Sequence, residues 1–178
     1  MRLDDATAAD LAVLARLHTE SWRIAYRGIF PDSYLDGDLY ANRLAKWRTI
    51  LAENGEWGII AREGEQAVGF VWVSEREVPV VESLHMLPGR RGGGGGPLLF
   101  AAAAERLIAR GQTELALYVF AGNAPAIRFY DALGGQMVGQ GIDDIAGHKV
   151  PDLRYRWTDL PALVAACRAR AQSRQSAR

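Results

Sequence analysis

Five consecutive glycines, Gly92 to Gly96, lie near the middle of the chain between two arginines and a proline. A backbone without Cβ atoms adopts positive φ freely and lets a ligand approach closely. Arg90 and Arg91 add formal positive charge before the run, and Pro97 follows where it suits a first helical turn. The free N–H groups and the dipole of a helix start attract phosphate oxygens. The stretch therefore predicts a loop that binds an anion such as pyrophosphate.

A flexible linker is an alternative interpretation of the glycine run, because linkers are also rich in glycine. Residues 98–110 argue against a linker, since they are rich in Leu and Ala and end at Arg110-Gly111, as a helix does. A Walker loop ends in Gly-Lys-Ser/Thr, and a dinucleotide fingerprint opens the first strand of a long parallel sheet, so both motifs fit poorly. A general nucleotide-phosphate-binding protein is an alternative that rests on this loop alone.

The size and composition of the chain suit one ordinary globular domain. It has 178 residues, of which 24% are charged, and its formal net charge is zero, so nothing calls for nucleic acid as a partner. No apolar stretch reaches the roughly 20 residues that span a bilayer, and the N-terminus lacks the apolar region of a signal peptide. We therefore expect a cytoplasmic protein without a membrane partner.

The single cysteine and the three histidines show no metal-ligand spacing, so we expect no metal. Cys167 occurs late in the chain without a nearby histidine and is interpreted as structural. His18 is interpreted as a packing residue on one face of the first helix.

Periodicity and turn residues predict helices and strands along the whole chain. Thr7 and Asp10 form a capping box before the first helix, and a loop with Gly28 and Pro31 follows that helix. Strands are expected at residues 1–5, 57–62, 67–74, 78–86, 114–119, 136–141 and 150–157, with His148 and Lys149 in the last loop. Further helices are expected at residues 39–53, ended by Asn54-Gly55, at 98–110, between Asn123 and Gly134, and from Asp159, fraying from Arg168.

Two motifs at a fixed separation carry a resemblance to a known superfamily. The first, Arg91-x-x-Gly94-x-Gly96, lies between a strand and a helix, and the second, Asn123-x-x-Ala126-x-x-Phe129-Tyr130, follows the next strand. In this order of elements the chain resembles the GCN5-related N-acetyltransferase (GNAT) superfamily over most of its length. The run from His18 to Asp32 is similar to the opening of a common bacterial branch.

The resemblance implies an α/β (α+β) fold, with a mixed, mostly antiparallel sheet flanked by helices and two strands that splay apart at an acetyl-CoA site. It implies one N-acetyltransferase domain over residues 1–160, and a C-terminal helix with a frayed basic tail over 161–178. Backbone groups of Leu84 and Met86 would pair with the pantetheine arm as an added strand does. The expected cofactor-binding residues are Leu84, His85, Met86, Arg91, Gly92, Gly93, Gly94, Gly95, Gly96, Pro97 and Asn123.

The activity that the resemblance implies is acetyl transfer from acetyl-CoA to a primary amine of a small molecule, protein or peptide, by direct attack in a ternary complex. A backbone N–H near Met86 would stabilise the oxyanion. Tyr130 stands where relatives commonly have a general acid for the departing thiolate, although helix packing is the other interpretation of this residue. Because an amine with a pKa near 10 must first lose a proton, the reaction also needs a base or a water chain.

Two positions depart from the superfamily's pattern. Val80 stands where many relatives carry a glutamate, and valine accepts no proton. Glu82 lies one pleat further on the same side, as a substitute base or a salt-bridged rim residue, whereas alternation turns His85 to the opposite face. Pro97 replaces a residue that often touches phosphate, which lowers the expected affinity for CoA. A non-catalytic module that binds CoA or senses acyl-CoA is therefore the alternative function.

Trp22 and Tyr26 are expected to bind the acceptor amine, in a segment that also contains Phe30, Arg23 and Arg27. The same side chains could instead pack the first helix onto the sheet. The fold does not choose the acceptor. Dimers are common among relatives, so a homodimer through the C-terminal strands or helix is a further expectation.

Overall fold

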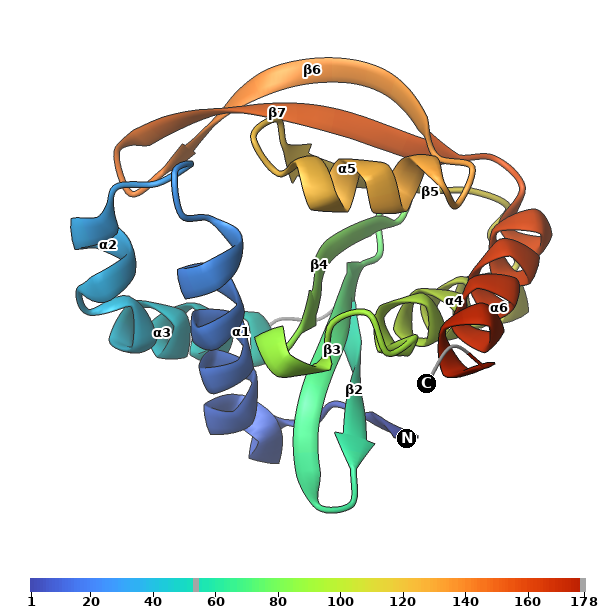
Figure 1. Ribbon diagram of the computed structural model, residues 1–178, viewed down its shortest axis with the longest axis horizontal. Coiled ribbons are helices and arrows are strands. Elements are labelled where there is room, and N and C mark those ends of the chain that lie inside the picture. Colours follow the sequence, from blue (N-terminus) through green and yellow to red (C-terminus); the bar gives the residue numbers. More distant parts are fainter. Residues whose placement is uncertain (53–54, 177–178) are drawn as a thin grey trace.

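The computed structural model describes residues 1–52 and 55–176, which form a mixed α/β fold with helices on both faces of one sheet (Figure 1). Its helices are α1 (Leu11–Ala25), α2 (Asp32–Asp36), α3 (Leu39–Ala52), α4 (Gly95–Ala109), α5 (Ala124–Asp131) and α6 (Leu160–Ser176). Its strands are β1 (Arg2–Asp5), β2 (Glu56–Glu63), β3 (Gln66–Ser74), β4 (Val80–Met86), β5 (Leu115–Phe120), β6 (Gln136–Ile145) and β7 (His148–Trp157). Short 3-10 turns, η1 (Ala8–Asp10) and η2 (Pro88–Arg90), precede α1 and the glycine run.

The strands form one sheet in the order β1-β2-β3-β4-β5-β7-β6. Neighbours are antiparallel except β4 and β5, which are parallel and pair only at Val80–Ala116 and Val81–Leu117. Beyond these two pairs β4 and β5 diverge, so the stretch of β4 from Glu82 to Met86 has a partner on one edge only. The mostly antiparallel sheet with splayed strands confirms the expected fold class.

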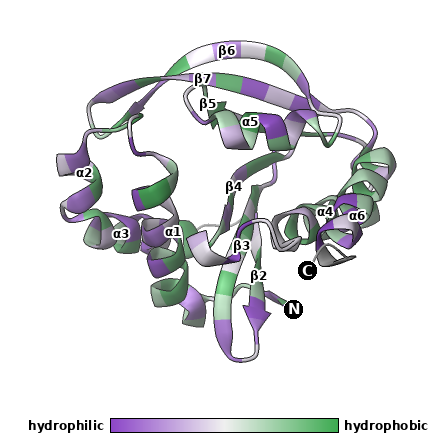
Figure 2. Ribbon diagram, in the orientation of Figure 1, coloured by the Kyte–Doolittle hydropathy of each residue, from purple (hydrophilic) through white to green (hydrophobic). Residues whose placement is uncertain are grey.

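Two helical layers cover the sheet. Helix α4 buries Leu99, Phe100 and Leu107 against one face, because its apolar residues recur at helical spacing (Figure 2). Helix α6 packs beside α4 and adds Cys167 to the same core, where burial raises the pKa of the thiol to about 12. Helices α1 and α3 cover the other face around Trp47. Cys167 is therefore a core side chain, as the sequence predicted.

The structure corrects several element boundaries. Helix α4 starts at Gly95 rather than residue 98, because Gly94 adopts a φ of +86° and serves as the N-cap. The helix α2 was not predicted, and α1 continues to Ala25. Helix α6 continues past Arg168 to Ser176. The predicted helix end at Asn54 lies outside the described residues.

The last hairpin is longer than predicted. His148 and Lys149 are the first residues of β7 rather than loop residues, and Ile145 pairs with His148. Ala146 and Gly147 between them both have positive φ, at 53° and 83°, which suits a two-residue turn that continues the twist of the strands. An Ala-Gly pair is a weaker sequence signal for this turn than Asn-Gly, so the hairpin was not recognised.

Strand β4 contains a bulge at Glu82. Trp72 pairs with Ser83 whereas Val73 pairs with Val81, so Glu82 is the extra residue between them. Because a bulge interrupts alternation, Ser83 and His85 return to the face of the sheet that carries Val80. The prediction that His85 points to the opposite face is therefore wrong.

Candidate active site

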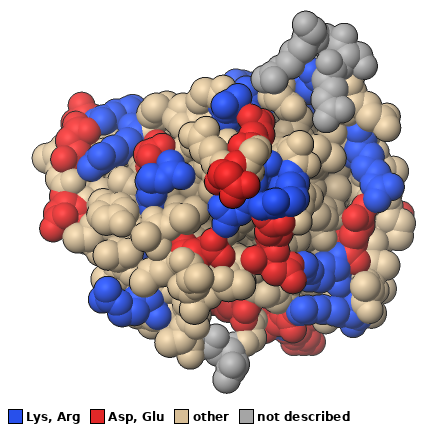
Figure 3. Space-filling model, turned by 90° about the horizontal axis from the view of Figure 1, so that it is seen from below, with Lys and Arg blue, Asp and Glu red and all other residues tan. Residues whose placement is uncertain are grey.

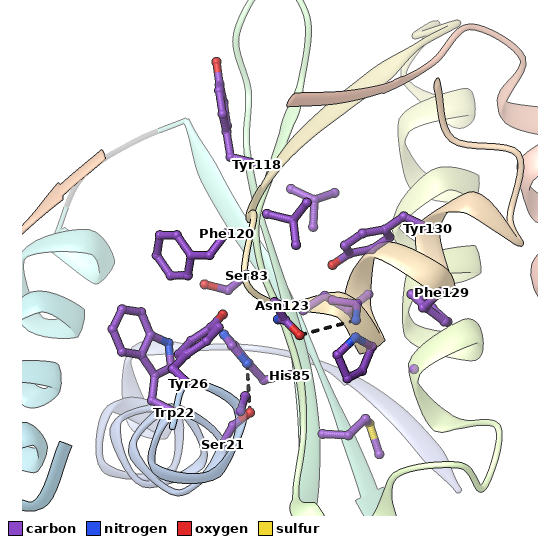
Figure 4. A pocket seen from close by; sticks show the side chains of 18 of the residues that line it. Ser21, Trp22, Tyr26, Ser83, His85, Tyr118, Phe120, Asn123, Phe129 and Tyr130 are labelled. Carbon is purple, nitrogen blue, oxygen red and sulfur yellow. Dashed lines mark hydrogen bonds between the residues drawn. The ribbon is translucent and has the colours of Figure 1, made fainter. Parts of the chain in front are cut away.

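A cavity of about 780 Å³ opens where β4 and β5 diverge. Side chains from α1, β4, β5 and α5 face it from several directions (Figure 4). It is lined by most of the residues expected from the sequence, namely Trp22, Tyr26, Glu82, Leu84, His85, Met86, Arg91, Gly92, Gly94, Gly96, Pro97, Asn123 and Tyr130. Gly93 and Gly95 are not part of the lining. The structure thus brings residues from distant parts of the chain to one cavity.

The glycine run forms the turn between η2 and α4 at one end of this cavity. Gly92 and Gly94 adopt φ values of +81° and +86°, which side chains with a Cβ rarely adopt. Gly95 and Gly96 are the first residues of α4, so their N–H groups have no partner within the helix, and Pro97 has no N–H to lose. Backbone donors and the helix dipole therefore favour an anion here.

The two arginines beside the glycine run have partners within the protein. Arg90 forms an ion pair with Glu63 at 2.9 Å. Arg91 lines the cavity, but its guanidinium donates to the Ser21 hydroxyl at 3.1 Å and to the Ser21 carbonyl at 3.3 Å. The charge of Arg90 is thus paired with a carboxylate, whereas Arg91 uses donors on neutral partners and keeps its charge.

The free edge of β4 offers backbone groups to the cavity. The N–H of Leu87 donates to Val68 on β3 at 2.8 Å. Backbone groups alternate in direction along an antiparallel strand, so those of Leu84 and Met86 point away from β3, toward the edge that β5 leaves open. An extended chain can pair with this edge.

His85 lies in a buried cluster between β4 and α1. Its Nδ1 lies 2.9 Å from the Ser21 hydroxyl, and its ring centroid is 5.0 Å from that of His18. Burial, aided by the charge of Arg91, lowers the pKa of His85 to about 3, so the ring is neutral at pH 7. His18 accepts a hydrogen bond from Trp47 at 3.1 Å and is buried, as expected of a packing residue, and it also lines the inner end of the cavity.

Glu82 lines the cavity and is partly exposed at its rim. Its carboxylate forms an ion pair with Arg76 at 2.7 Å. Burial raises the pKa of Glu82 above its ordinary value, and the nearby Arg76 opposes this rise. The residue is therefore both salt-bridged and directed at the cavity, so the geometry is compatible with each of its two expected roles.

Tyr130 projects from α5 into the cavity, across from Tyr26 on α1 (Figure 4). Its ring packs edge-on against Phe100 and Trp157, and it is 8% exposed. Burial raises its pKa, so the phenol is protonated at neutral pH and can donate a proton. Asn123 caps α5 by accepting from the N–H of Ala126 at 3.3 Å, which leaves its amide nitrogen for other partners.

Trp22 and Tyr26 form the wall of the cavity opposite α5. Their rings pack edge-on with centroids 4.7 Å apart. Burial raises the pKa of Tyr26 to about 12. Phe30 packs behind this wall, in one buried cluster with Trp22, and does not line the cavity. Arg27 pairs with Asp32 at 2.8 Å and does not line the cavity either. The aromatic segment thus supplies both core and cavity residues.

Several cavity residues were not predicted from the sequence. They come from α1, α3, β5, the last hairpin and α6, and include Ser21, Lys46, Phe120, Asp143, Asp152, Arg170 and Arg174. No local motif marks these residues, since only the tertiary fold brings their elements together. The spacing of Arg170 and Arg174, four residues apart on one helix, is the one signal that was available.

Two further properties concern possible metals and partners. In the described part of the chain, no group of three or more His, Cys, Asp or Glu side chains could hold a metal ion. No helix among the described residues is long and apolar enough to cross a membrane. The face shown in Figure 3 carries intermixed acidic and basic side chains rather than one large patch of a single sign.

Comparison with known proteins gives consistent matches. Residues 16–134 match the acetyltransferase (GNAT) family. An uncharacterised N-acetyltransferase of Bacillus subtilis, YuaI, is 29% identical over 167 residues, which cover 89% of this chain and 94% of the relative. A crystal structure of a GCN5-related N-acetyltransferase from Rhodopseudomonas palustris aligns with a TM-score of 0.75 at 20% identity, over 88% of this chain and 94% of the other. PaiA N-acetyltransferase from Thermoplasma acidophilum, solved in complex with coenzyme A, aligns with a TM-score of 0.66 at 19% identity, over 88% of this chain and 100% of the other.

Proposed function

The chain belongs to the acetyltransferase (GNAT) family, and from that premise we propose that it transfers the acetyl group of acetyl-CoA to a primary amine of a small molecule. The observation that carries this proposal is the divergence of β4 and β5 beside the glycine run, in a cavity that also contains Tyr130. The relative solved with coenzyme A supports the choice of cosubstrate.

The cofactor end of the cavity fits acetyl-CoA by its chemistry. The open edge of β4 can pair with the amide groups of the pantetheine arm through Leu84 and Met86. The backbone of the glycine turn and the N–H of Gly96, at the start of α4, can hold the pyrophosphate without interference from side chains. Acetyl-CoA supplies a thioester carbonyl, and a backbone N–H near Met86 would stabilise the oxyanion that forms on it.

Two side chains are proposed to move protons. Glu82 accepts a proton from the ammonium form of the acceptor, directly or through water, and its raised pKa makes it a better base than an ordinary carboxylate. Tyr130 donates a proton to the departing thiolate. The neutral His85, with a pKa near 3, is a weak base and positions Ser21 instead.

The acceptor is proposed to enter between α1 and the last hairpin. Trp22, Tyr26 and Phe120 provide aromatic surface there, and the Tyr26 hydroxyl provides a donor. An amine with an apolar or aromatic body suits this wall. Direct attack in a ternary complex needs no enzyme nucleophile, and the buried Cys167 would be a poor one.

The test is an acetylation assay on the purified full-length chain. Acetyl-CoA and a panel of amines are incubated with the protein, free CoA thiol is followed with a disulfide reagent, and acetylated amine is identified by mass spectrometry. We expect thiol release that depends on both the protein and one amine of the panel. Tight binding of acetyl-CoA by calorimetry with no acetylated product from any amine would favour the non-catalytic CoA-binding module.

A further inference from the structure

The C-terminal helix α6 brings two arginines to the cofactor end of the cavity. Arg170 and Arg174 both line the cavity, and their four-residue spacing places them on one face of α6. Neither forms an ion pair with a carboxylate among the described residues. Arg168, on the same helix, pairs with Glu105 at 2.5 Å and does not line the cavity. The two cavity arginines are thus available to a ligand, whereas their neighbour is not.

The glycine run and α6 are in direct contact, which fixes this arrangement. A Cβ on Gly94 would lie 3.1 Å from the carbonyl oxygen of Ala171, and Ala171 itself is buried. The backbone of α6 therefore packs onto the turn that starts α4, with α4 and α6 side by side (Figure 1). Only glycine at position 94 permits so close an approach.

Arg170 is held above the cavity by an aromatic contact. Its guanidinium carbon lies 5.8 Å from the ring centroid of Phe129, and Phe129 also lines the cavity. A cation over an aromatic face is attracted by the ring, and this contact leaves the N–H donors at the edge of the guanidinium available. The helix thus presents Arg170 beside α5 rather than to bulk solvent alone.

Without α6, the segment around the glycine run supplies little positive charge to an anionic ligand. Arg90 is paired with Glu63, and Arg91 donates to Ser21. CoA carries a pyrophosphate and a 3′-phosphate, and guanidinium groups match phosphate oxygens in geometry and charge. The glycine run offers N–H donors and the single charge of Arg91, whose partners at Ser21 are neutral, and this is less positive charge than two phosphate groups call for.

We propose that Arg170 and Arg174 bind a phosphate group of the cosubstrate, so that α6 is part of the cofactor site. This inference rests on the proposed use of acetyl-CoA. It assigns a ligand-binding role to the basic end of α6, and it explains how a glycine run that ends in Pro97 is compensated for the phosphate-binding side chain that it lacks.

The experiment measures binding of CoA and of 3′-dephospho-CoA by calorimetry at low ionic strength. The variants are Arg170→Ala, Arg174→Ala, the double variant, and Arg168→Ala as the matched control from the same helix. We expect each single cavity variant to weaken CoA binding about ten- to a hundredfold, as for loss of a charge-assisted hydrogen bond, and Arg168→Ala to leave it unchanged. Melting temperatures of all variants show whether α6 remains folded, and Arg170→Lys, which keeps the charge, should restore part of the lost affinity.

The dephospho ligand identifies which phosphate is bound. If the arginines hold the 3′-phosphate, the wild-type protein binds dephospho-CoA more weakly than CoA. The variants then bind dephospho-CoA with the same affinity as the wild type. If they hold the pyrophosphate, both ligands lose affinity equally in the variants. If the double variant binds CoA as tightly as the wild-type protein, the proposed role of α6 is overturned and the proposed function is not. Failure of the wild-type protein to bind CoA would overturn the proposed function, and this inference with it.

Discussion

The two ends of the cavity are built by different means. The proposed cofactor end is lined largely by backbone, from the open edge of β4 and the start of α4 at Gly96, with Arg170 and Arg174 of α6 beside it. At the acceptor end it faces side chains, including Trp22 and Tyr26, from α1. A site made of backbone groups recognises one ligand shape and depends little on which side chains are present. A site made of side chains can come to bind another ligand after few substitutions. Under the proposed function, cosubstrate binding therefore depends mainly on backbone geometry, with the arginines of α6 adding charge, and acceptor choice depends on side chains.

The largest effect is expected from Gly94→Asp, which disrupts the backbone of the cofactor end. The new Cβ would lie 3.1 Å from the Ala171 carbonyl, the residue would be strained at a φ of +86°, and a negative charge would be added beside the proposed phosphate site. We expect acetyl-CoA affinity to fall at least about a hundredfold by calorimetry, equivalent to about 2.7 kcal/mol. Gly92→Ala is the control, because Gly92 also has a positive φ but a Cβ there would meet no atom within 4 Å. We expect this variant to lose only several-fold in acetyl-CoA affinity. Unchanged affinity in Gly94→Asp would place the cofactor elsewhere.

Tyr130→Phe separates the binding of CoA from the proposed transfer step. Loss of the phenol proton should lower kcat about a hundredfold, while the CoA dissociation constant stays within a factor of two, since the ring and its packing remain. Tyr155→Phe is the control, because its hydroxyl donates to Asp131 at 2.7 Å and does not line the cavity. Equal turnover by wild-type protein and Tyr130→Phe would leave helix packing as the role of this tyrosine.

The cofactor end was largely predictable from the sequence, and for a physical reason. Positive φ and free N–H groups require particular residue types at particular spacings, so Gly94 and Asn123 can be recognised locally. The strands and most helices were predictable as well, because their apolar periodicity is also a local property.

The acceptor end was less predictable, because its geometry depends on contacts between distant segments. The bulge at Glu82 arises from the register of β4 against β3, and it alone returns His85 to the face of Val80. One part of the cofactor end was not predictable either, because from the sequence Arg170 and Arg174 look like an ordinary solvated helix end, and only the position of α6 places them at the cavity. A basic helix end and a binding site have the same sequence pattern.

The proposed base at the acceptor end can be tested through pH. Below its pKa Glu82 is protonated and accepts no proton, so kcat/KM should fall as the pH drops through that raised value. Glu82→Gln should remove this acidic limb and lower kcat/KM about a hundredfold at about pH 7.5. Because the Arg76 charge lowers the pKa of Glu82, Arg76→Met should shift the limb to higher pH.

Glu77→Gln, an exposed change outside the cavity in the same region, is the control for both variants and should keep the wild-type profile. If Glu82 is only a salt-bridged rim residue without a catalytic role, Glu82→Gln and Arg76→Met should leave the position of the acidic limb unchanged. Identical profiles in all three variants would therefore remove Glu82 from the proposed mechanism.

The smallest expected effect tests whether acceptor recognition is separate from cosubstrate binding. The Tyr26 hydroxyl points toward the cavity, and its pKa near 12 keeps it protonated as a hydrogen-bond donor (Figure 4). Tyr26→Phe should raise KM for the acceptor about two- to tenfold, the usual range for one neutral hydrogen bond, and leave acetyl-CoA affinity unchanged. Tyr40→Phe, at an exposed site on α3, is the control. If Tyr26→Phe weakened acetyl-CoA binding as much as acceptor binding, the two ends would not be independent, because a side chain of the acceptor wall would then also shape the backbone site.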